Sequence, residues 1–366
     1  MPYDLFLLSA ILRGKRRTAM KRVLMIGPDI DARGGVASVV KGYYRSGLDS
    51  LCELKYITSA VEGPMPRKLI AAFRAYKDFR LAVDEFDIVH VHMSSGSSYE
   101  RKRLFIHSAI ESGKSVILHT HSARFKGFFE SANSFKQQQI RSLFSSVSLV
   151  VTLSEQWRDF YADSICDVSK IRVLHNGVRI PQNHLSSFES RDILFLGRLD
   201  DNKSPDVLLL ALKSILEKHP KLRVRFCGDG DIDLYRRKAE VLGVEGNCDF
   251  LGWVDGAEKE ILFERSGILC LPSKGEGMPM SVLEAMAHGL TVIATPVGGI
   301  PRIIEDGVNG CIVPVGDISM LADSLERLVD DASLRNRLGR AGRKVVMRDF
   351  DEVGQVRKLA NLYEAL

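Results

Sequence analysis

Short apolar runs rich in β-branched residues alternate with amphipathic stretches of 10 to 17 residues along nearly the whole chain from Lys21. This alternation is typical of repeated strand-and-helix units around a parallel sheet. Most of the runs are largely apolar, as expected for strands that helices cover on both faces. The strands predicted in the first half lie at residues 22–27, 53–58, 87–92, 115–120, 148–153 and 170–175.

A stretch rich in Gly, Pro, Asn and Ser at residues 176–192 interrupts this pattern and predicts a linker. The chain has 366 residues, more than the roughly 250 to 300 that one hydrophobic core supports, so two domains with a cleft between them are expected. We predict an α/β fold with two Rossmann-like, doubly wound domains that face each other across this cleft. The second series of strands is predicted at residues 193–197, 222–228, 247–252, 267–272, 291–295 and 310–314.

The predicted domain boundary follows from the position of the linker. We place an N-terminal domain at residues 1–187 and a C-terminal domain at residues 188–350. Residues 351–366 form a predicted closing helix that could pack against either domain.

Cysteine spacing and the distribution of charge indicate the cellular compartment and the kinds of partner to expect. The six cysteines occur singly, which favours buried thiols in a reducing cytoplasm over disulfides or a zinc site. Residues 1–187 hold 27 Lys and Arg against 17 Asp and Glu, whereas residues 188–366 hold 24 against 29. A basic first domain suits an anionic lipid surface or a phosphorylated acceptor, and solvated helix faces explain its charge equally well. The sequence has no motif for nucleic-acid binding.

The first residues combine an apolar run, Leu5 to Leu12, with the basic cluster at residues 13–17. The run has eight residues, whereas a helix needs about 20 to cross a bilayer. A secretory signal carries its positive charges before the apolar run, and here they follow it. Two alternatives remain for residues 1–19: a short interfacial anchor that holds the protein peripherally on the inner face of the membrane, or an extension upstream of a start at Met20.

Two acids, Glu276 and Glu284, lie between the predicted strands at 267–272 and 291–295. Pro279 predicts a helix start and Gly289 its end. Glu276 then lies in the loop at a strand's carboxyl end, and Glu284 about one and a half turns into the helix, so both could face the cleft. Free N–H groups in the first turn of this helix would suit a phosphate or a sugar hydroxyl.

Glu284 needs a separate argument because most helical glutamates are simply solvated. Its neighbours Val282, Leu283, Ala285 and Met286 are apolar. An unpaired carboxylate in such a buried segment is costly. We therefore expect a partner for Glu284, which the vicinal diol of a sugar would supply.

The Glu276-x7-Glu284 spacing resembles the signature of the retaining family 4 glycosyltransferases, which have the GT-B fold. Other segments resemble that family in the expected order, from Met20 onward and more closely in the second domain than in the first. They are "GGVASVV", "LHTHS", "VLHNGV", "LFLGRLDDNKSPDVLLLAL", "FCGDGD", "FLGWV" and "TPVGGIPRIIEDGVNG".

The resemblance implies that the domain at residues 1–187 binds the acceptor and that the domain at residues 188–350 binds a nucleotide sugar. It also implies a role for each matching residue of the second domain. Glu284 would bind the ribose hydroxyls of a nucleotide diphosphate sugar. Glu276, with the backbone of Gly277 and Met278, would bind the donor hexose. The base of the donor, whether that of UDP, GDP or ADP, is not specified by these residues.

Two cations, Arg198 and Lys203, would hold the donor diphosphate, by the same resemblance. Two positive charges can stabilise a departing nucleoside diphosphate without a metal ion. For Arg198 the alternative is a surface ion pair with Asp200 or Asp201. We expect no cofactor and no metal requirement, with the nucleotide sugar as co-substrate.

In the first domain, His121 resembles the family's cleft histidine near the reacting end of the donor sugar, and a structural role is the alternative. His119 and His121 share one strand face, as do His90 and His92, so four imidazoles could be read as a metal site. No carboxylate or thiolate lies at ligand spacing beside them. We therefore predict that they bind no metal.

Gly34 and Gly35 lie between the first strand and the first helix, where a phosphate or an acceptor could approach the backbone. The alternative is an ordinary turn. The full G-x-G-x-x-G is absent, which argues against a redox dinucleotide. Asp29, Asp229 and Asp231 could suggest a metal-binding acid pair, but their positions between strands and helices favour turn and cap residues.

These expectations combine into one function: transfer of a hexose, with retention, from a nucleotide diphosphate sugar to a glycan or a lipid-linked glycan, in surface polysaccharide biosynthesis. No carboxylate is placed as a nucleophile, so we expect a front-face substitution. The alternatives are a nucleotide-sugar 2-epimerase, which also has two Rossmann halves, and a non-catalytic binding relative.

Overall fold

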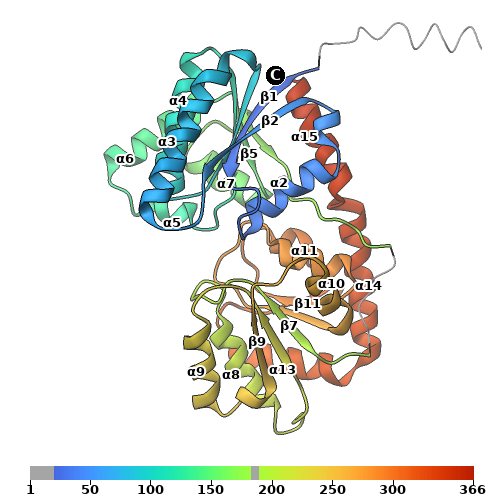
Figure 1. Cartoon of the computed structure of the whole chain (residues 1–366). Coiled ribbons are helices and arrows are strands. Elements are labelled where there is room, and N and C mark those ends of the chain that lie inside the picture. The colour runs from blue at the N-terminus through green and yellow to red at the C-terminus, as the bar shows by residue number, and fades with distance from the viewer. Residues whose placement is uncertain (1–19, 183–188) are drawn as a thin grey trace, which may run out of the picture.

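The computed structural model describes residues 20–182 and 189–366. Two α/β lobes lie one above the other, and each is built on a six-stranded parallel sheet (Figure 1). The fold class predicted from the sequence is thereby confirmed. Two sequence predictions, the apolar run and basic cluster before Met20 and the boundary between residues 187 and 188, lie outside the described residues.

The first sheet has the strand order β2-β1-β3-β4-β5-β6. Its strands are β1 (Arg22–Pro28), β2 (Glu53–Ala60), β3 (Ile88–Met93), β4 (Ser115–Thr120), β5 (Leu149–Thr152) and β6 (Ile171–Val173). The helices of this lobe are α2 (Gly35–Arg45), α3 (Met65–Ala82), α4 (Ser97–Glu111), α5 (Phe125–Glu130), α6 (Ser134–Ser146) and α7 (Glu155–Ser164).

The second sheet has the order β12-β11-β10-β7-β8-β9. Its strands are β7 (Ile193–Leu196), β8 (Val224–Cys227), β9 (Cys248–Gly252), β10 (Ile268–Leu271), β11 (Thr291–Ala294) and β12 (Cys311–Ile312). The helices that follow β7 are α8 (Pro205–Ile215), α9 (Ile232–Leu242), α10 (Gly256–Arg265), α11 (Met280–Ala287), α12 (Ile300–Ile303), α13 (Ile318–Asp330), α14 (Ala332–Asp349) and α15 (Glu352–Glu364). All twelve strands agree with the sequence prediction to within two residues at each end.

Alternate side chains of β1 enter two different hydrophobic cores. Leu24 and Ile26 pack on one face of the sheet with residues of α3 and α4. Val23 and Met25 pack on the other face with residues of α2 and α15. Both faces of this strand are therefore covered, which explains why its sequence is apolar without alternation.

Each sheet has one place where the order of its strands reverses. It lies between β1 and β3 in the first sheet and between β7 and β10 in the second. In open parallel sheets the loops that leave the two strands at such a switch point separate and leave a crevice, where ligands bind. The loops after β1, β3, β7 and β10 are therefore the first places to search for a site.

Helix α15 returns to the first lobe at the end of the chain (Figure 1). Its residues Val356, Leu359 and Tyr363 belong to the core that contains β1 and α2. At its start, Glu352 accepts hydrogen bonds from Arg45 at 2.6 Å and from Ser46 at 2.8 Å. The last helix therefore ties the end of the second lobe to the first sheet.

Two further expectations concern the whole chain. All six cysteines are free thiols, and five of them are buried, as predicted. Across the residues that the structure describes, none of the helices combines the length and the apolar character needed to cross a bilayer.

Candidate functional site

A buried ion pair lies at the switch point of the second sheet. The ammonium Nζ of Lys203, in the loop after β7, lies 2.5 Å from Oε1 of Glu276, in the loop after β10. The Ser273 hydroxyl donates to the same carboxylate oxygen at 2.6 Å. Only 7% of the Glu276 side chain and 21% of the Lys203 side chain are exposed. Two of the residues predicted from the sequence are thus brought together.

Two hydrogen bonds hold the loop after β7 against the loop after β10. The Asn202 side chain donates to the Gly275 carbonyl at 2.9 Å, and the Lys274 amide donates to the Asn202 carbonyl at 2.7 Å. Ser204, directly after Lys203, has a φ of 51°, a left-handed conformation that costs energy for a residue with a side chain. The chain therefore holds Lys203 in one orientation at the expense of local strain.

Arg198 lies in the same loop after β7 as Lys203, with 59% of its side chain exposed. Its guanidinium lies 3.0 Å from Asp229, which follows β8, and 3.9 Å from Asp200. The alternative considered from the sequence, an ion pair with Asp200, is therefore present as the longer contact. Because the arginine is exposed, its pair with Asp229 is one that an incoming anion can replace at small cost.

Glu284 has a cation partner of its own. Its Oε1 lies 2.9 Å from Nζ of Lys259 on α10, and both side chains are largely buried. The partner expected from burial thus exists, but it is a lysine of the protein. Lys259 was not singled out in the sequence, because no spacing links it to Glu284 before the packing of α10 on α11 is known. The two acids are thus paired with different lysines, Glu276 with Lys203 and Glu284 with Lys259.

Helix α11 begins and ends as its sequence predicts. Pro279 occupies the position before the first helical residue, and no side chain caps the free N–H groups there. Gly289 follows the helix with a φ of 84°, the left-handed conformation that glycine adopts without strain. The first turn of α11 therefore keeps its N–H groups for an external acceptor.

Residues of the first lobe contact the loop after β10. Trp157 Nε1 donates to the Glu276 carbonyl at 3.3 Å, and Asn176 donates to the Met278 carbonyl at 2.9 Å. A Cβ atom on Gly277 would lie 3.1 Å from the carbonyl oxygen of His121. The structure thus brings His121 of the first lobe to the same loop as Glu276, Gly277 and Met278.

Gly34 and Gly35 lie at the N-terminus of α2, close to the second lobe. Gly34 has a φ of 136°, and a Cβ at either glycine would meet no atom within 4 Å. No side chain caps α2, and its first turn has no acid. The neighbouring Arg33 lies over the Trp253 ring of the second lobe at 5.9 Å. The backbone here is thus open to an anion on the side that faces the second lobe.

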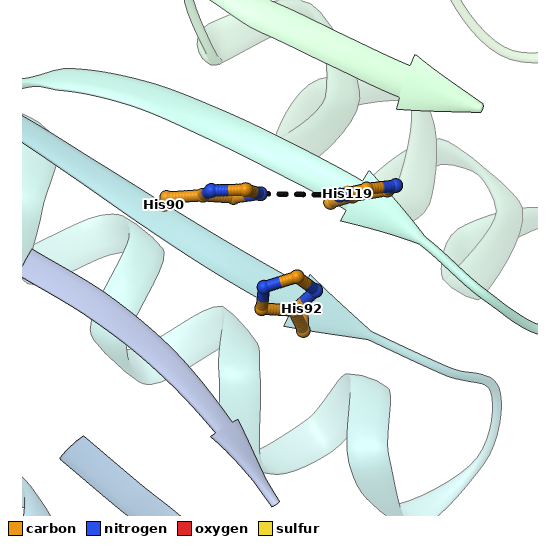
Figure 2. Close-up of side chains that lie close together, drawn as sticks. All are labelled: His90, His92 and His119. Atoms are coloured by element: carbon orange, nitrogen blue, oxygen red, sulfur yellow. Dashed lines mark hydrogen bonds between the residues drawn. The ribbon is translucent and has the colours of Figure 1, made fainter. Parts of the chain in front are cut away.

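The four histidines predicted to share strand faces form one cluster. His92 Nδ1 lies 2.8 Å from His121 Nε2, and His90 Nε2 lies 3.2 Å from His119 Nδ1. The other ring nitrogen of His90 lies 2.6 Å from the Tyr363 hydroxyl of α15. Figure 2 shows His90 and His119, joined by their hydrogen bond, with His92 beside them. His121 is therefore the end of a buried polar cluster that reaches the cleft.

Ring nitrogens of His90, His92 and His119 all lie within 4.8 Å of one another, a spacing that a metal ion could bridge (Figure 2). Burial lowers the pKa of His90 and of His121 to about 3 and holds the pKa of His92 and His119 well below the usual value. Neutral imidazoles pair through N–H···N hydrogen bonds, and those pairs use both nitrogens of His90. His92 Nε2 and His119 Nε2 are also buried but have no hydrogen-bond partner, so the absence of a bound metal stays a prediction.

The remaining aspartates act largely as predicted. The Asp231 side chain accepts from the Leu234 amide at 3.1 Å and caps α9. Asp29 accepts from the Asp31 amide at 3.1 Å within a turn. Asp229 differs, because it pairs with Arg198 instead of capping a helix.

Two Rossmann-like sheets whose loops meet at Lys203, Glu276 and His121 define a protein of the GT-B class. Comparison with known families supports this directly. Residues 37–180 match the family described as Glycosyltransferase Family 4, and residues 179–345 match the family described as Glycosyl transferases group 1. The chain therefore belongs to the glycosyltransferases of the family 4 type.

Individual relatives are more distant. The D-inositol 3-phosphate glycosyltransferase of Corynebacterium efficiens is 30% identical over 236 residues, 59% of this chain and 55% of that protein. The phosphatidyl-myo-inositol mannosyltransferase of Mycolicibacterium smegmatis is 34% identical over 181 residues, 49% of this chain and 46% of that protein. The chain thus spans about half the length of the curated relatives it matches.

Among solved structures, HepE from Anabaena in complex with UDP-glucose has a TM-score of 0.74 to this chain. The likeness covers 94% of this chain and 100% of that one at 17% identity, and it concerns the fold alone.

Proposed function

We propose that this chain is a retaining, metal-independent hexosyltransferase. It transfers a hexose from a nucleotide diphosphate sugar to a glycan or lipid-linked glycan during surface polysaccharide assembly, on the cytoplasmic side of the membrane. The observation that carries the proposal is the buried Lys203–Glu276 pair at the switch point, with His121 of the first lobe at the same loop.

The donor would lie across the carboxyl ends of β7 and β10. Its diphosphate would contact Lys203 and Arg198, and its hexose would contact Glu276 and the backbone at Gly277 and Met278. Its ribose hydroxyls would bind Glu284, which Lys259 already orients at 2.9 Å. The HepE complex with UDP-glucose supports a donor of this class on this fold.

The acceptor would approach from the first lobe, between His121 and the open backbone at Gly34 and Gly35. Two matched relatives are named for inositol 3-phosphate and phosphatidyl-myo-inositol, which supports an acceptor that carries a phosphate. A phosphate also suits the uncapped N-terminus of α2.

Retention by front-face substitution is the reaction that fits these groups. The bond from the anomeric carbon to the diphosphate oxygen breaks, and both electrons leave with the phosphate, which the two cations stabilise. The acceptor oxygen bonds to the anomeric carbon on the same face and loses its proton to the departing phosphate oxygen. The neutral imidazole of His121 would hold a sugar or acceptor hydroxyl by a hydrogen bond.

The proposal is tested by the anomeric configuration of the product, measured by NMR with UDP, GDP and ADP sugars and a panel of lipid-linked acceptors. We expect the anomeric configuration of the transferred hexose to be the same in the product as in the donor. An inverted product, or an inverted glycosyl azide from a Glu276→Ala variant supplied with azide, contradicts the front-face route.

A nucleotide-sugar 2-epimerase is the second candidate, because it also uses two Rossmann halves around one nucleotide sugar. Incubation with the donor alone separates the two. An epimerised nucleotide sugar favours the epimerase, whereas slow hydrolysis or no change favours the transferase.

A further inference from the structure

Helix α3 packs against the first lobe through only one of its sides. Ala75, Phe79 and Ala82 are buried, and the first turns of the helix are exposed throughout. No other helix of the described chain exposes more than one large apolar side chain, whereas α3 exposes five. These are Met65 (68% exposed), Leu69 (64%), Ile70 (54%), Phe73 (73%) and Leu81 (72%).

The exposed apolar residues are grouped on the side of α3 that faces away from the protein. At about 100° per residue, Leu69, Phe73 and Ile70 project opposite to the buried Phe79 and Ala82. The helix thus has two apolar sides, of which the first lobe covers one. Exposed apolar residues grouped in this way mark a surface with a partner.

Positive charge lies among these apolar side chains. The helix has five basic residues against a single acid, Asp78. None of the ion pairs within the described ranges involves Arg67, Lys68, Arg74 or Lys77. Arg80 donates to the Ser108 hydroxyl at 2.6 Å, so four of the five basic side chains are free to meet an anionic partner. The five are Arg67, Lys68, Arg74, Lys77 and Arg80.

A groove runs beside the helix, along the edge strand β2 of the first sheet. It has a volume of about 1120 Å³, and its lining includes Ile70 of α3 and Tyr56 of β2. Three basic residues, Lys55, Arg67 and Arg74, and two acids, Asp78 and Glu85, also line it. Apolar and cationic groups therefore continue from the helix surface into a depression large enough for a lipid headgroup with part of a chain.

We infer that the exposed side of α3, with the groove beside β2, is a docking surface for an anionic lipid bilayer. Phe73 and Leu69 enter the boundary between headgroups and acyl chains, and the exposed Arg74 and Lys77, four and seven residues after Ile70, meet the anionic headgroups. A bilayer satisfies both kinds of side chain at once over the length of the helix. The lobe that docks is the one that carries His121 and Gly34, so the inference rests on the proposed lipid-linked acceptor for its purpose.

Co-sedimentation of the full chain with vesicles tests the inference. One set of vesicles is phosphatidylcholine alone, and in the other phosphatidylglycerol replaces about a third of it. We expect binding to the anionic vesicles and a drop of about tenfold or more in a Leu69→Gln/Phe73→Gln variant, because the two apolar side chains no longer enter the bilayer. The matched control is Phe135→Gln/Val241→Gln, which changes two exposed apolar residues on other helices and should bind as the unchanged protein does.

The charge is tested in the same way. Arg74→Gln/Lys77→Gln should weaken binding to the anionic vesicles several-fold, whereas Lys213→Gln/Lys344→Gln, two exposed lysines of the second lobe, should not. The inference is overturned if neither α3 double variant weakens vesicle binding, or if the protein binds equally to the two kinds of vesicle.

Binding of a nucleoside diphosphate, followed by thermal shift in each variant, keeps this inference separate from the proposed function. The α3 variants should retain that shift. If the protein binds the nucleotide but not the vesicles, the docking surface is contradicted and the proposed function is not. If it binds vesicles through α3 but no nucleotide, the proposed function is contradicted and the docking surface is not.

Discussion

Gly277 of the second lobe lies directly against His121 of the first, so close that a Cβ atom on this glycine would approach the histidine carbonyl oxygen to 3.1 Å and Leu153 to 3.2 Å. Real Cβ atoms rarely make contacts this short. The loop that carries Glu276 and the segment that carries His121 therefore approach this closely because residue 277 has no side chain.

Gly277→Ala should impair activity more than stability. The added methyl group pushes the two lobes apart by a few tenths of an ångström, which misaligns the groups contributed by each. We expect kcat/KM to fall by about tenfold, or roughly 1.4 kcal/mol. Gly246→Ala is the control, because a Cβ there meets no atom within 4 Å. Equal activities of the two variants would show that close approach at Gly277 is unimportant.

Lys203→Met should destabilise the fold, because it leaves the Glu276 carboxylate buried without its cation. Loss of one partner of such a pair costs about 3 kcal/mol or somewhat more. Urea unfolding measures this change. The matched control is Lys274→Met, which breaks another pair of 2.5 Å, with the well-exposed Asp201, and should cost less than about 1 kcal/mol. If the two variants unfold alike, the Lys203–Glu276 pair is not the buried interaction described here.

Glu284→Gln should raise the KM for the donor about tenfold with little change in kcat, because a ribose contact is present equally in the ground state and the transition state. Steady-state kinetics with varied donor measures both constants. Glu258→Gln changes an exposed glutamate on α10 and should leave the KM unchanged. A fall in kcat alone would instead place Glu284 at the reacting centre.

The histidine cluster makes stability depend on pH. Burial lowers the pKa of His90 and His121 from 6.5 to about 3, so the unfolded chain binds more protons than the folded chain between these two values. Their contribution to stability is complete above pH 6.5 and is lost as the pH falls towards 3. Each such imidazole lowers the free energy of unfolding by up to about 1.4 kcal/mol per pH unit.

Urea unfolding at pH 7.5 and pH 5 measures this slope. We expect a marked loss of stability at the lower pH and a shallower slope in a His119→Gln variant. His107→Gln should keep the full slope, because that ring is exposed in the folded chain. A stability that does not change between the two pH values would contradict the buried, neutral state of the cluster.

Metal independence is tested on the active protein. Treatment with a chelator should leave both the transfer rate and the melting temperature unchanged, because Arg198 and Lys203 supply the positive charge. A loss of either that zinc or manganese restores would instead assign an ion to His90, His92 and His119.

The sequence predicted the strands well, because strands covered on both faces leave runs such as "RVLMIG" that few other structures tolerate. It also predicted that Glu276 and Lys203 serve one site, since both follow strands of the second sheet. The switch point between β7 and β10 depends on the strand order, which no local pattern encodes.

Contacts between distant elements were not predictable in this way. Lys259 meets Glu284 only after α10 packs on α11. His92 and His119 become neighbours through the register of β3 on β4. The sequence placed these histidines on shared strand faces but could not pair them across strands. The exposed side of α3 was also missed, because a helix with two apolar sides reads as a buried one.

Nucleoside diphosphate binding tests the central claim, that one pyrophosphate-bearing molecule is held by the loops after β7 and β10. Thermal shift with UDP, GDP and ADP should raise the melting temperature for at least one of them, since a ligand at 100 times its Kd adds about 2.7 kcal/mol to the stability of the folded state. The account predicts that Arg198→Met, which alters an exposed side chain, keeps the fold and loses most of this shift. A shift of full size in Arg198→Met, or no shift with any of the three in the unchanged protein, would contradict it.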